Sequence, residues 1–151
     1  MKNSRKINKN AKDARRMLSD DSGAIAVEFA LVAPVLLMAL LGILSYGMYF
    51  GVANSVQQLA ANAARASVSG LNDDERAAIA RQHVAVEAPA YVLLDASRAS
   101  VRAAPSSSDP AMFQVAVSYD ASRMAIWAFS GIIPLPSKTI TRTAVIQRGG
   151  Y

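Results

Sequence analysis

The hydrophobic pattern of the chain begins with one long uncharged run. Residues 29–50 read FALVAPVLLMALLGILSYGMYF, 22 residues without a charged side chain. As a helix this run spans about 33 Å at ~1.5 Å per residue, which is enough to cross the hydrocarbon core of a bilayer. A buried helix of a small soluble domain keeps a polar face, and residues 29–44 have none. The run therefore predicts a transmembrane helix.

Beyond the run, the apolar positions change to a helical period. They recur at steps of four and three, at Val52, Val56, Leu59, Ala63 and Ala66. The transmembrane helix is thus expected to continue as an amphipathic rod from Ala24 to Val68, about 67 Å at ~1.5 Å per residue, and to stop at Gly70. We place the membrane anchor at residues 24–52 and an extracytoplasmic domain at residues 53–151.

The domain is expected to contain one more helix and three strands. Asn72 followed by Glu75 resembles a capping box, and the helix it starts would run to about Glu87, before Pro89. Strand patterns follow at residues 99–103, 113–119 and 138–147, with a polar turn at residues 105–110 between the first two. The predicted fold class is α+β: a long transmembrane helix, then a small domain whose further helix packs on a three-stranded antiparallel sheet.

The segment between the last two strands is unusually apolar. Residues 124–136 read MAIWAFSGIIPLP, which is too hydrophobic for a freely exposed loop. Trp127 and Phe129 are candidates for the membrane surface, for a partner protein or for the core of the sheet. We expect the core, because aromatic residues beside a small sheet usually fill it.

The charge of the chain is concentrated at its front. Of a formal net charge of +5, residues 1–22 carry +4, from seven basic and three acidic residues. The rest holds nine basic and eight acidic residues in no stripe, which argues against nucleic-acid binding. Cysteine is absent, so disulfides and thiolate metal sites are excluded.

The placement of basic and aromatic residues predicts the orientation in the membrane. Lysines and arginines precede the apolar run, whereas Tyr46, Tyr49 and Phe50 end it in the manner of an interfacial belt. The N-terminus is therefore expected in the cytoplasm. A secretory signal peptide cut near Ala63 is the rival reading, but its apolar region would be much shorter and would end next to the cleavage site.

The junction between the basic leader and the apolar run carries the most informative residues. Gly23 is followed five residues later by Glu28, the one charge near the start of the apolar stretch. A carboxylate at the end of a membrane helix is costly without a cation. Cleavage after Gly23 would supply one, the new α-amino group of Ala24, which is largely protonated near neutral pH and which a neighbouring subunit could present.

This junction and its helix, GAIAVEFALVAPVLLMALLGI, resemble the TadE-like family, the pseudopilins of tight-adherence (Flp) pilus systems. Gly23, Glu28 and Phe29 match the family pattern, and the C-terminal stretch from VAVSYD to TAVIQR is also similar. The resemblance implies that a prepilin peptidase removes the cytoplasmic leader, residues 1–23, between Gly23 and Ala24. It implies recognition and assembly roles for Glu28 and Phe29.

The same resemblance implies the location and the partners. The protein is expected in the bacterial inner membrane as a single-pass subunit, with its C-terminal domain in the periplasm. Its partners would be the peptidase, other pseudopilins and pilins, the inner-membrane assembly platform and the lipid bilayer. Its expected function is that of a minor pilin needed for assembly of the pilus and hence for surface adherence, not that of the main fibre subunit.

Three further positions in the anchor invite interpretation. Pro34 removes a backbone donor and predicts a local kink. Gly47 and Gly51 form a Gly-xxx-Gly pair that would let a second helix approach, although glycines are also common in membrane helices.

No residue pattern indicates catalysis. His83 lies among polar residues of the second predicted helix, with no carboxylate cluster for a metal, and phosphate loops, nucleophile elbows and HExxH are absent from the sequence. We expect no enzyme activity, no metal and no cofactor. Two other functions stay open: an unprocessed single-pass protein whose outer domain is a binding module, and a secreted domain released near Ala63.

Overall fold

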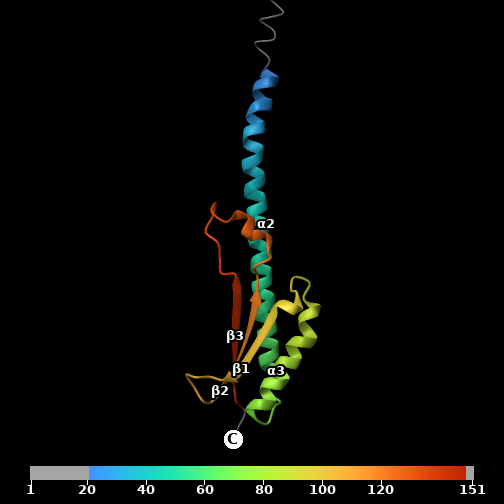
Figure 1. The fold of residues 1–151 in the computed structure, drawn as a ribbon, viewed down its shortest axis with the longest axis vertical. Coiled ribbons are helices and arrows are strands. Elements are labelled where there is room, and N and C mark those ends of the chain that lie inside the picture. Colours follow the sequence, from blue (N-terminus) through green and yellow to red (C-terminus); the bar gives the residue numbers. More distant parts are fainter. Residues whose placement is uncertain (1–20, 149–151) are drawn as a thin grey trace, which may run out of the picture. The chain divides into compact units, whose positions relative to one another are not determined.

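The structure, a computed structural model, describes residues 21–148. Figure 1 shows its elements, which in chain order are α2 (Asp21–Ser67), α3 (Asp73–Glu87), the 3₁₀ helices η1 (Ala88–Ala90) and η2 (Ala96–Arg98), β1 (Ala99–Pro105), β2 (Met112–Asp120), the 3₁₀ helix η3 (Ala125–Phe129) and β3 (Thr139–Gln147). The predicted α+β class is confirmed. Residues 1–20 of the predicted basic leader lie outside the residues that the structure describes. By its contacts the chain divides into two units, with the boundary inside α2 between Leu41 and Gly42.

The first unit contains the N-terminal part of α2. Its side chains from Gly23 to Leu41 are exposed or, at Ala33, half-buried, although most of them are apolar. The helix continues through Pro34 without ending, as the sequence indicated. The kink expected at Pro34 stays a prediction.

The second unit is built around the C-terminal part of α2. Val52, Val56, Leu59 and Ala63 are buried, which confirms the helical period that the sequence predicted, while Ala66 is half-buried. The helix ends at Ser67, and Gly70 follows in the turn. A Cβ at Gly70 would lie 2.7 Å from the backbone nitrogen of Arg76, so only glycine lets the turn come this close to α3.

Helix α3 begins as its sequence predicts. The Asn72 side chain accepts a hydrogen bond from the Glu75 backbone N–H at 2.9 Å. The Glu75 carboxylate in turn accepts from the backbone N–H of Leu71, one residue before the position that a capping box normally uses. Ala77, Ala80 and Val84 form the buried face of this helix.

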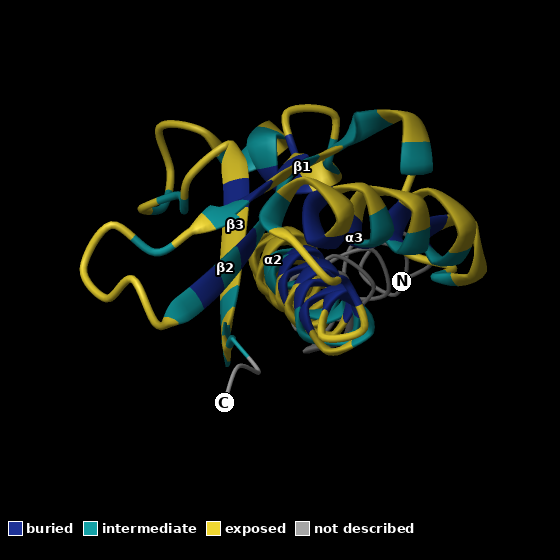
Figure 2. Ribbon diagram, turned by 90° about the horizontal axis from the view of Figure 1, so that it is seen from below, coloured by how far each residue is buried: buried dark blue, intermediate teal, exposed yellow. Residues whose placement is uncertain are grey.

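The sheet has three antiparallel strands, as predicted, and their order is β1-β2-β3, which makes β2 the central strand. On β2, Phe113, Val115, Val117 and Tyr119 are buried in strict alternation. Helix α3 packs directly against β1, and Figure 2 shows the C-terminal half of α2 beside both α3 and the sheet. The largest buried side chains of both layers therefore face one another across a single core.

The start of the predicted polar turn needs correction. Pro105 is the last residue of β1, where it pairs with Phe113, and the turn begins only at Ser106. A proline is tolerated there because β1 is an edge strand, and its missing N–H removes no bond from a central ladder.

The apolar segment at residues 124–136 partly covers the core. Ile126 of η3 is completely buried, although the sequence analysis did not single it out. Trp127 is half-buried, packs against the core as expected, and donates its Nε1–H to the backbone oxygen of Ala121 at 2.6 Å. Phe129 is half-buried and does not join that cluster.

Candidate functional site: the apolar helix and its junction

The N-terminal part of α2 exposes apolar side chains on every face. Phe29 and Leu31 are 70% and 71% exposed, and Val27, Leu36 and Leu40 are similarly open. Such a surface is far larger than the apolar patches that soluble monomers leave in water. Among the described residues, the segment from Gly23 to Ser67 contains the one helix long and apolar enough to span a membrane. The chain is thus consistent with a single-pass membrane protein.

Glu28 is the single charged residue on this apolar surface. It is the only charged residue between Gly23 and Ala64, and the next basic residue along the chain is Arg65. Its side chain is exposed, and no ion pair to it occurs within the described part of the chain. A carboxylate in an apolar surrounding is strongly disfavoured unless a cation meets it. No side chain of residues 23–64 can supply that cation, because this stretch contains no lysine, arginine or histidine.

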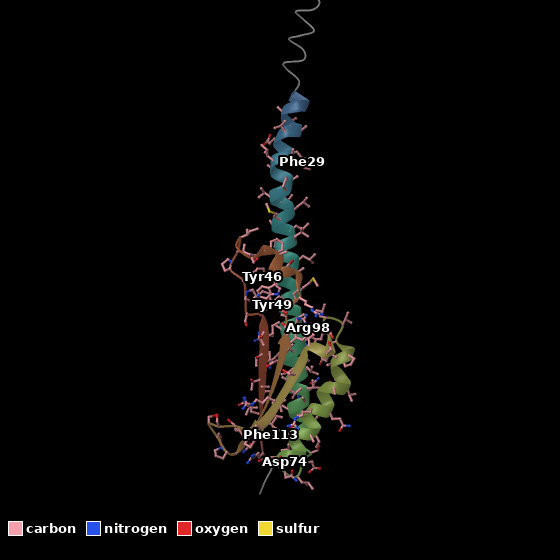
Figure 3. All side chains as sticks on the ribbon, viewed as in Figure 1. Phe29, Tyr46, Tyr49, Asp74, Arg98 and Phe113 are labelled. Atoms are coloured by element: carbon pink, nitrogen blue, oxygen red, sulfur yellow. The ribbon has the colours of Figure 1, made fainter. Side chains whose placement is uncertain are left out.

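The other predicted junction residues share the first turns of α2 with Glu28. Gly23 and Ala24 are exposed helical residues, and nothing lies within 4 Å of a Cβ placed on Gly23. Ala24 stands four residues before Glu28, so the two positions lie on the same face one turn apart. Phe29 is exposed on the neighbouring face, as the label in Figure 3 marks. The junction is therefore accessible along its whole length.

The two glycines proposed for helix packing have different surroundings. A Cβ on Gly51 would come within 2.8 Å of the Leu93 side chain of the same chain, so this position already serves packing inside the domain. Gly47 has nothing within 4 Å and stays open. The packing of this pair against a second helix stays a prediction. Gly47 is the better candidate, because its surface is open and that of Gly51 is covered by Leu93.

Tyr46 and Tyr49 have partners that the sequence analysis missed. The hydroxyl of Tyr46 donates to the backbone oxygen of Pro134, and that of Tyr49 donates to the backbone oxygen of Ser137 at 3.0 Å. Ser45 and Tyr49 are buried. The spacing Ser45, Tyr49, Val52 already continues the helical period of the rod backwards, and this pattern could have placed the start of the buried face seven residues earlier.

An ion pair joins the last residue of β2 to the residue that precedes β1. Arg98 Nη2 lies 2.9 Å from Asp120 Oδ2 and 3.0 Å from Ser122 Oγ, and its guanidinium stands 5.8 Å from the Tyr119 ring centre. The backbone N–H of Ser122, and then Arg98, lower the pKa of Asp120 from 3.8 to about 2. A hydrogen bond from the Ser97 side chain likewise lowers the pKa of Asp95. These contacts hold the edge of the sheet.

The remaining candidate for chemistry is modest. His83 Nε2 lies 3.2 Å from Glu87 Oε2, one turn further along α3. Within residues 21–148, no group of three or more histidine, aspartate or glutamate side chains is arranged to hold a metal ion. A pocket of about 250 Å³ lies between Ser45, Met48, Arg98 and Arg123, and the guanidinium of Arg98 is already paired with Asp120.

Comparison with known proteins identifies the N-terminal helix. Residues 23–65 match the family model described as TadE-like protein, which confirms the resemblance that the junction predicted. No curated protein and no solved structure matches the chain. The matched family is pilus-associated and is not a family of enzymes, and the match supports involvement in Tad pilus assembly in general. Residues 23–65, which lie within α2, are thus similar to the TadE-like family.

Proposed function

We propose that the protein is a pseudopilin, a minor subunit that a prepilin peptidase cuts between Gly23 and Ala24 before it takes part in building a Tad-type pilus. The observation that carries the proposal is the isolation of Glu28. It is the only charge in a 42-residue helical stretch, residues 23–64, and it is exposed where apolar side chains surround it. Cleavage creates a cation four residues before it.

The charge created by cleavage has the right protonation state and the right place. An α-amino group has an ordinary pKa of about 7.7–8.0, so it is mostly positive near neutral pH. In the free subunit, the amino group of Ala24 lies one turn from Glu28 on the same face. In the assembly, a neighbouring subunit presents its own amino group to Glu28, and the low dielectric of the apolar surroundings strengthens the pair. Because Glu28 then pairs with the neighbour's amino group and no longer with its own, the pair fixes one axial register between neighbouring helices.

In this proposal the protein has three kinds of partner: the peptidase, the other pilins and the assembly platform. Its sheet domain lies in the periplasm. A pilus built this way mediates surface adherence. The proposal needs no cofactor. It assigns the apolar faces of α2 to lipid before assembly and to neighbouring helices afterwards, which explains why they are unpaired in the single chain.

The test removes the charge of Glu28 and keeps its shape. In cells with the complete pilus system, we expect Glu28→Gln to reduce surface pili strongly, because the neighbour's amino group then faces no carboxylate. The matched control is Asp74→Asn, which removes an exposed carboxylate of α3 that makes no ion pair in the described part of the chain. Normal piliation in the Glu28→Gln cells would refute the pairing.

The alternative, an unprocessed tethered binding module, predicts the opposite behaviour. Such a protein keeps its leader and is indifferent to Glu28. The pocket beside Arg98 and Arg123 does not favour this alternative, since its other lining residues are mostly apolar and Arg98 is committed to Asp120 and Ser122.

A further inference from the structure

The loop between β2 and β3 exposes apolar side chains at its tip. Here the tip means residues 129–135, FSGIIPL. Ile132 is 69% exposed, Phe129 and Ile133 are half-buried outside the core cluster, and Leu135 is half-buried against that cluster. Gly131 has a φ of 88°, a backbone conformation that favours glycine and that turns the chain at this point. The tip is therefore a formed apolar projection and not merely the continuation of the buried η3.

Two tyrosines fix the tip at one level of α2. Tyr46 donates to the Pro134 oxygen, and Tyr49 donates to the Ser137 oxygen at 3.0 Å. Figure 3 labels both tyrosines beside this loop, at the end of the domain opposite to the label of Asp74. The tip consequently lies next to the part of α2 that directly follows Leu44.

That level of α2 is where a bilayer would end. The strongly exposed aliphatic side chains of the helix run from Ile25 to Leu44, with Ile43 at 74% exposure. Twenty residues of helix span about 30 Å, the thickness of the hydrocarbon core. From Ser45 onward the helix begins to bury side chains in the domain. The water interface thus falls near Tyr46, the residue that holds the tip.

The charges around the tip fit a lipid headgroup region. Lys138 Nζ stands 5.5 Å from the Trp127 ring centre, and Arg123 lies at the other end of the loop. The acidic residue nearest in sequence, Asp120, is neutralised by Arg98. An apolar tip flanked by basic residues is the arrangement that seats proteins at the boundary of headgroups and acyl chains.

We propose that residues 129–135 form a second membrane contact, in which Ile132 inserts into the outer face of the bilayer that α2 crosses. The contact seats the sheet domain on the lipid surface and limits its rotation about the helix. It rests on α2 spanning the membrane and is independent of cleavage after Gly23. A subunit leaving the membrane for a pilus must release this contact.

The experiment uses the fact that the chain has one tryptophan, Trp127. The double variant Trp127→Phe with Ile132→Trp carries its only indole at the tip. The matched control, Trp127→Phe with Leu71→Trp, carries it in the turn before α3, at a side chain that is 88% exposed. Both full-length proteins are reconstituted in phosphatidylcholine and phosphatidylglycerol vesicles, with and without brominated acyl chains. Unfolding curves of the two variants establish that the domain is intact.

The proposal predicts that the Ile132→Trp protein emits at shorter wavelength than the control and loses most of its emission in brominated vesicles. The Leu71→Trp control should be quenched by aqueous iodide and be indifferent to bromine. Equal iodide quenching of both variants would overturn the proposal. A blue shift without bromine quenching, growing with the ratio of protein to lipid, would also overturn it, because the tip then meets a second copy of the chain.

Discussion

At the scale of single residues, the side-chain oxygens of Asn72 and Asp120 each accept a hydrogen bond from a backbone N–H at the end of a helix or strand. Asn72 accepts the Glu75 N–H at 2.9 Å at the start of α3, and Asp120 accepts the Ser122 N–H at 2.9 Å after β2. Such bonds are worth about 0.5–2 kcal/mol when the acceptor is replaced by alanine at a helix start. Both hydrogen bonds join residues that are close in sequence, and the capping-box pattern predicts the one that Asn72 accepts.

For Asn72→Ala we expect the free energy of unfolding to fall by about 1 kcal/mol, because the first turn of α3 loses its cap. Urea denaturation of the full chain in detergent micelles measures the change. Gln58→Ala, on the exposed face of α2, is the matched control and should change stability by much less. An unchanged urea midpoint in Asn72→Ala would show that Leu71 and Glu75 hold the helix start without the cap.

The Asp120 carboxylate predicts a pH dependence. Its pKa falls to about 2 in the folded protein from an ordinary value of 3.8, so folding favours the ionised form. The stabilisation is complete above the unfolded pKa and disappears as the pH falls toward about 2. Asp120→Asn should therefore be less stable than the natural protein at pH 6, and the difference should shrink between about pH 4 and pH 2. Urea midpoints at several pH values would reveal a constant difference if Asp120 acts through shape alone.

At the scale of elements, the two glycines at positions 47 and 70 make opposite predictions. Gly70→Ala would force a Cβ against the Arg76 backbone at 2.7 Å, and we expect a loss of about 1–3 kcal/mol in unfolding free energy. Gly47→Ala meets nothing within 4 Å and should leave the single chain as stable or slightly more so. Denaturation curves of the two variants provide the comparison, and a tolerated Gly70→Ala would mean that the turn shifts freely.

The elements also show where prediction from sequence succeeds. Helix α3 and strand β2 follow from capping residues and strict alternation, which are local signals, and both lie where expected. The cluster of proline, serine and aspartate at residues 105–110 predicts a turn that starts at Pro105, but Pro105 pairs with Phe113 in an edge strand, where a proline is tolerated. The bonds from Tyr46 and Tyr49 to the β2–β3 loop join residues 88 positions apart, and no local pattern encodes them.

The junction was readable from sequence for a different reason. Gly23 and Glu28 stand out because one is small and the other charged in an apolar stretch, and the family match covers that stretch. The proposed partner of Glu28 belongs to a neighbouring subunit, so neither the sequence nor the fold of a single chain supplies it. The boundary of the domain is a further case, because the contacts change at Gly42 while the apolar run continues to Phe50.

At the scale of the whole molecule, the chain combines a helix suited to lipid with a domain that has its own core. The core of the second unit joins α2, α3 and all three strands, with Leu59, Phe113 and Val117 completely buried. Because the described core begins at Ser45, we expect the domain to fold without the N-terminal part of α2. The function proposed for the molecule then depends on one covalent event at its other end, cleavage at the junction.

The measurement that tests this account most directly is the intact mass and N-terminal sequence of the protein, extracted from membranes of cells that contain the pilus system with its peptidase. The account predicts an N-terminus at Ala24 and a mass reduced by residues 1–23. Cells lacking the peptidase should yield the uncut chain. An N-terminus at Met1 in cells with active peptidase would contradict the pseudopilin proposal and favour a tethered domain, and one near Ala64 would contradict the membrane anchor as well.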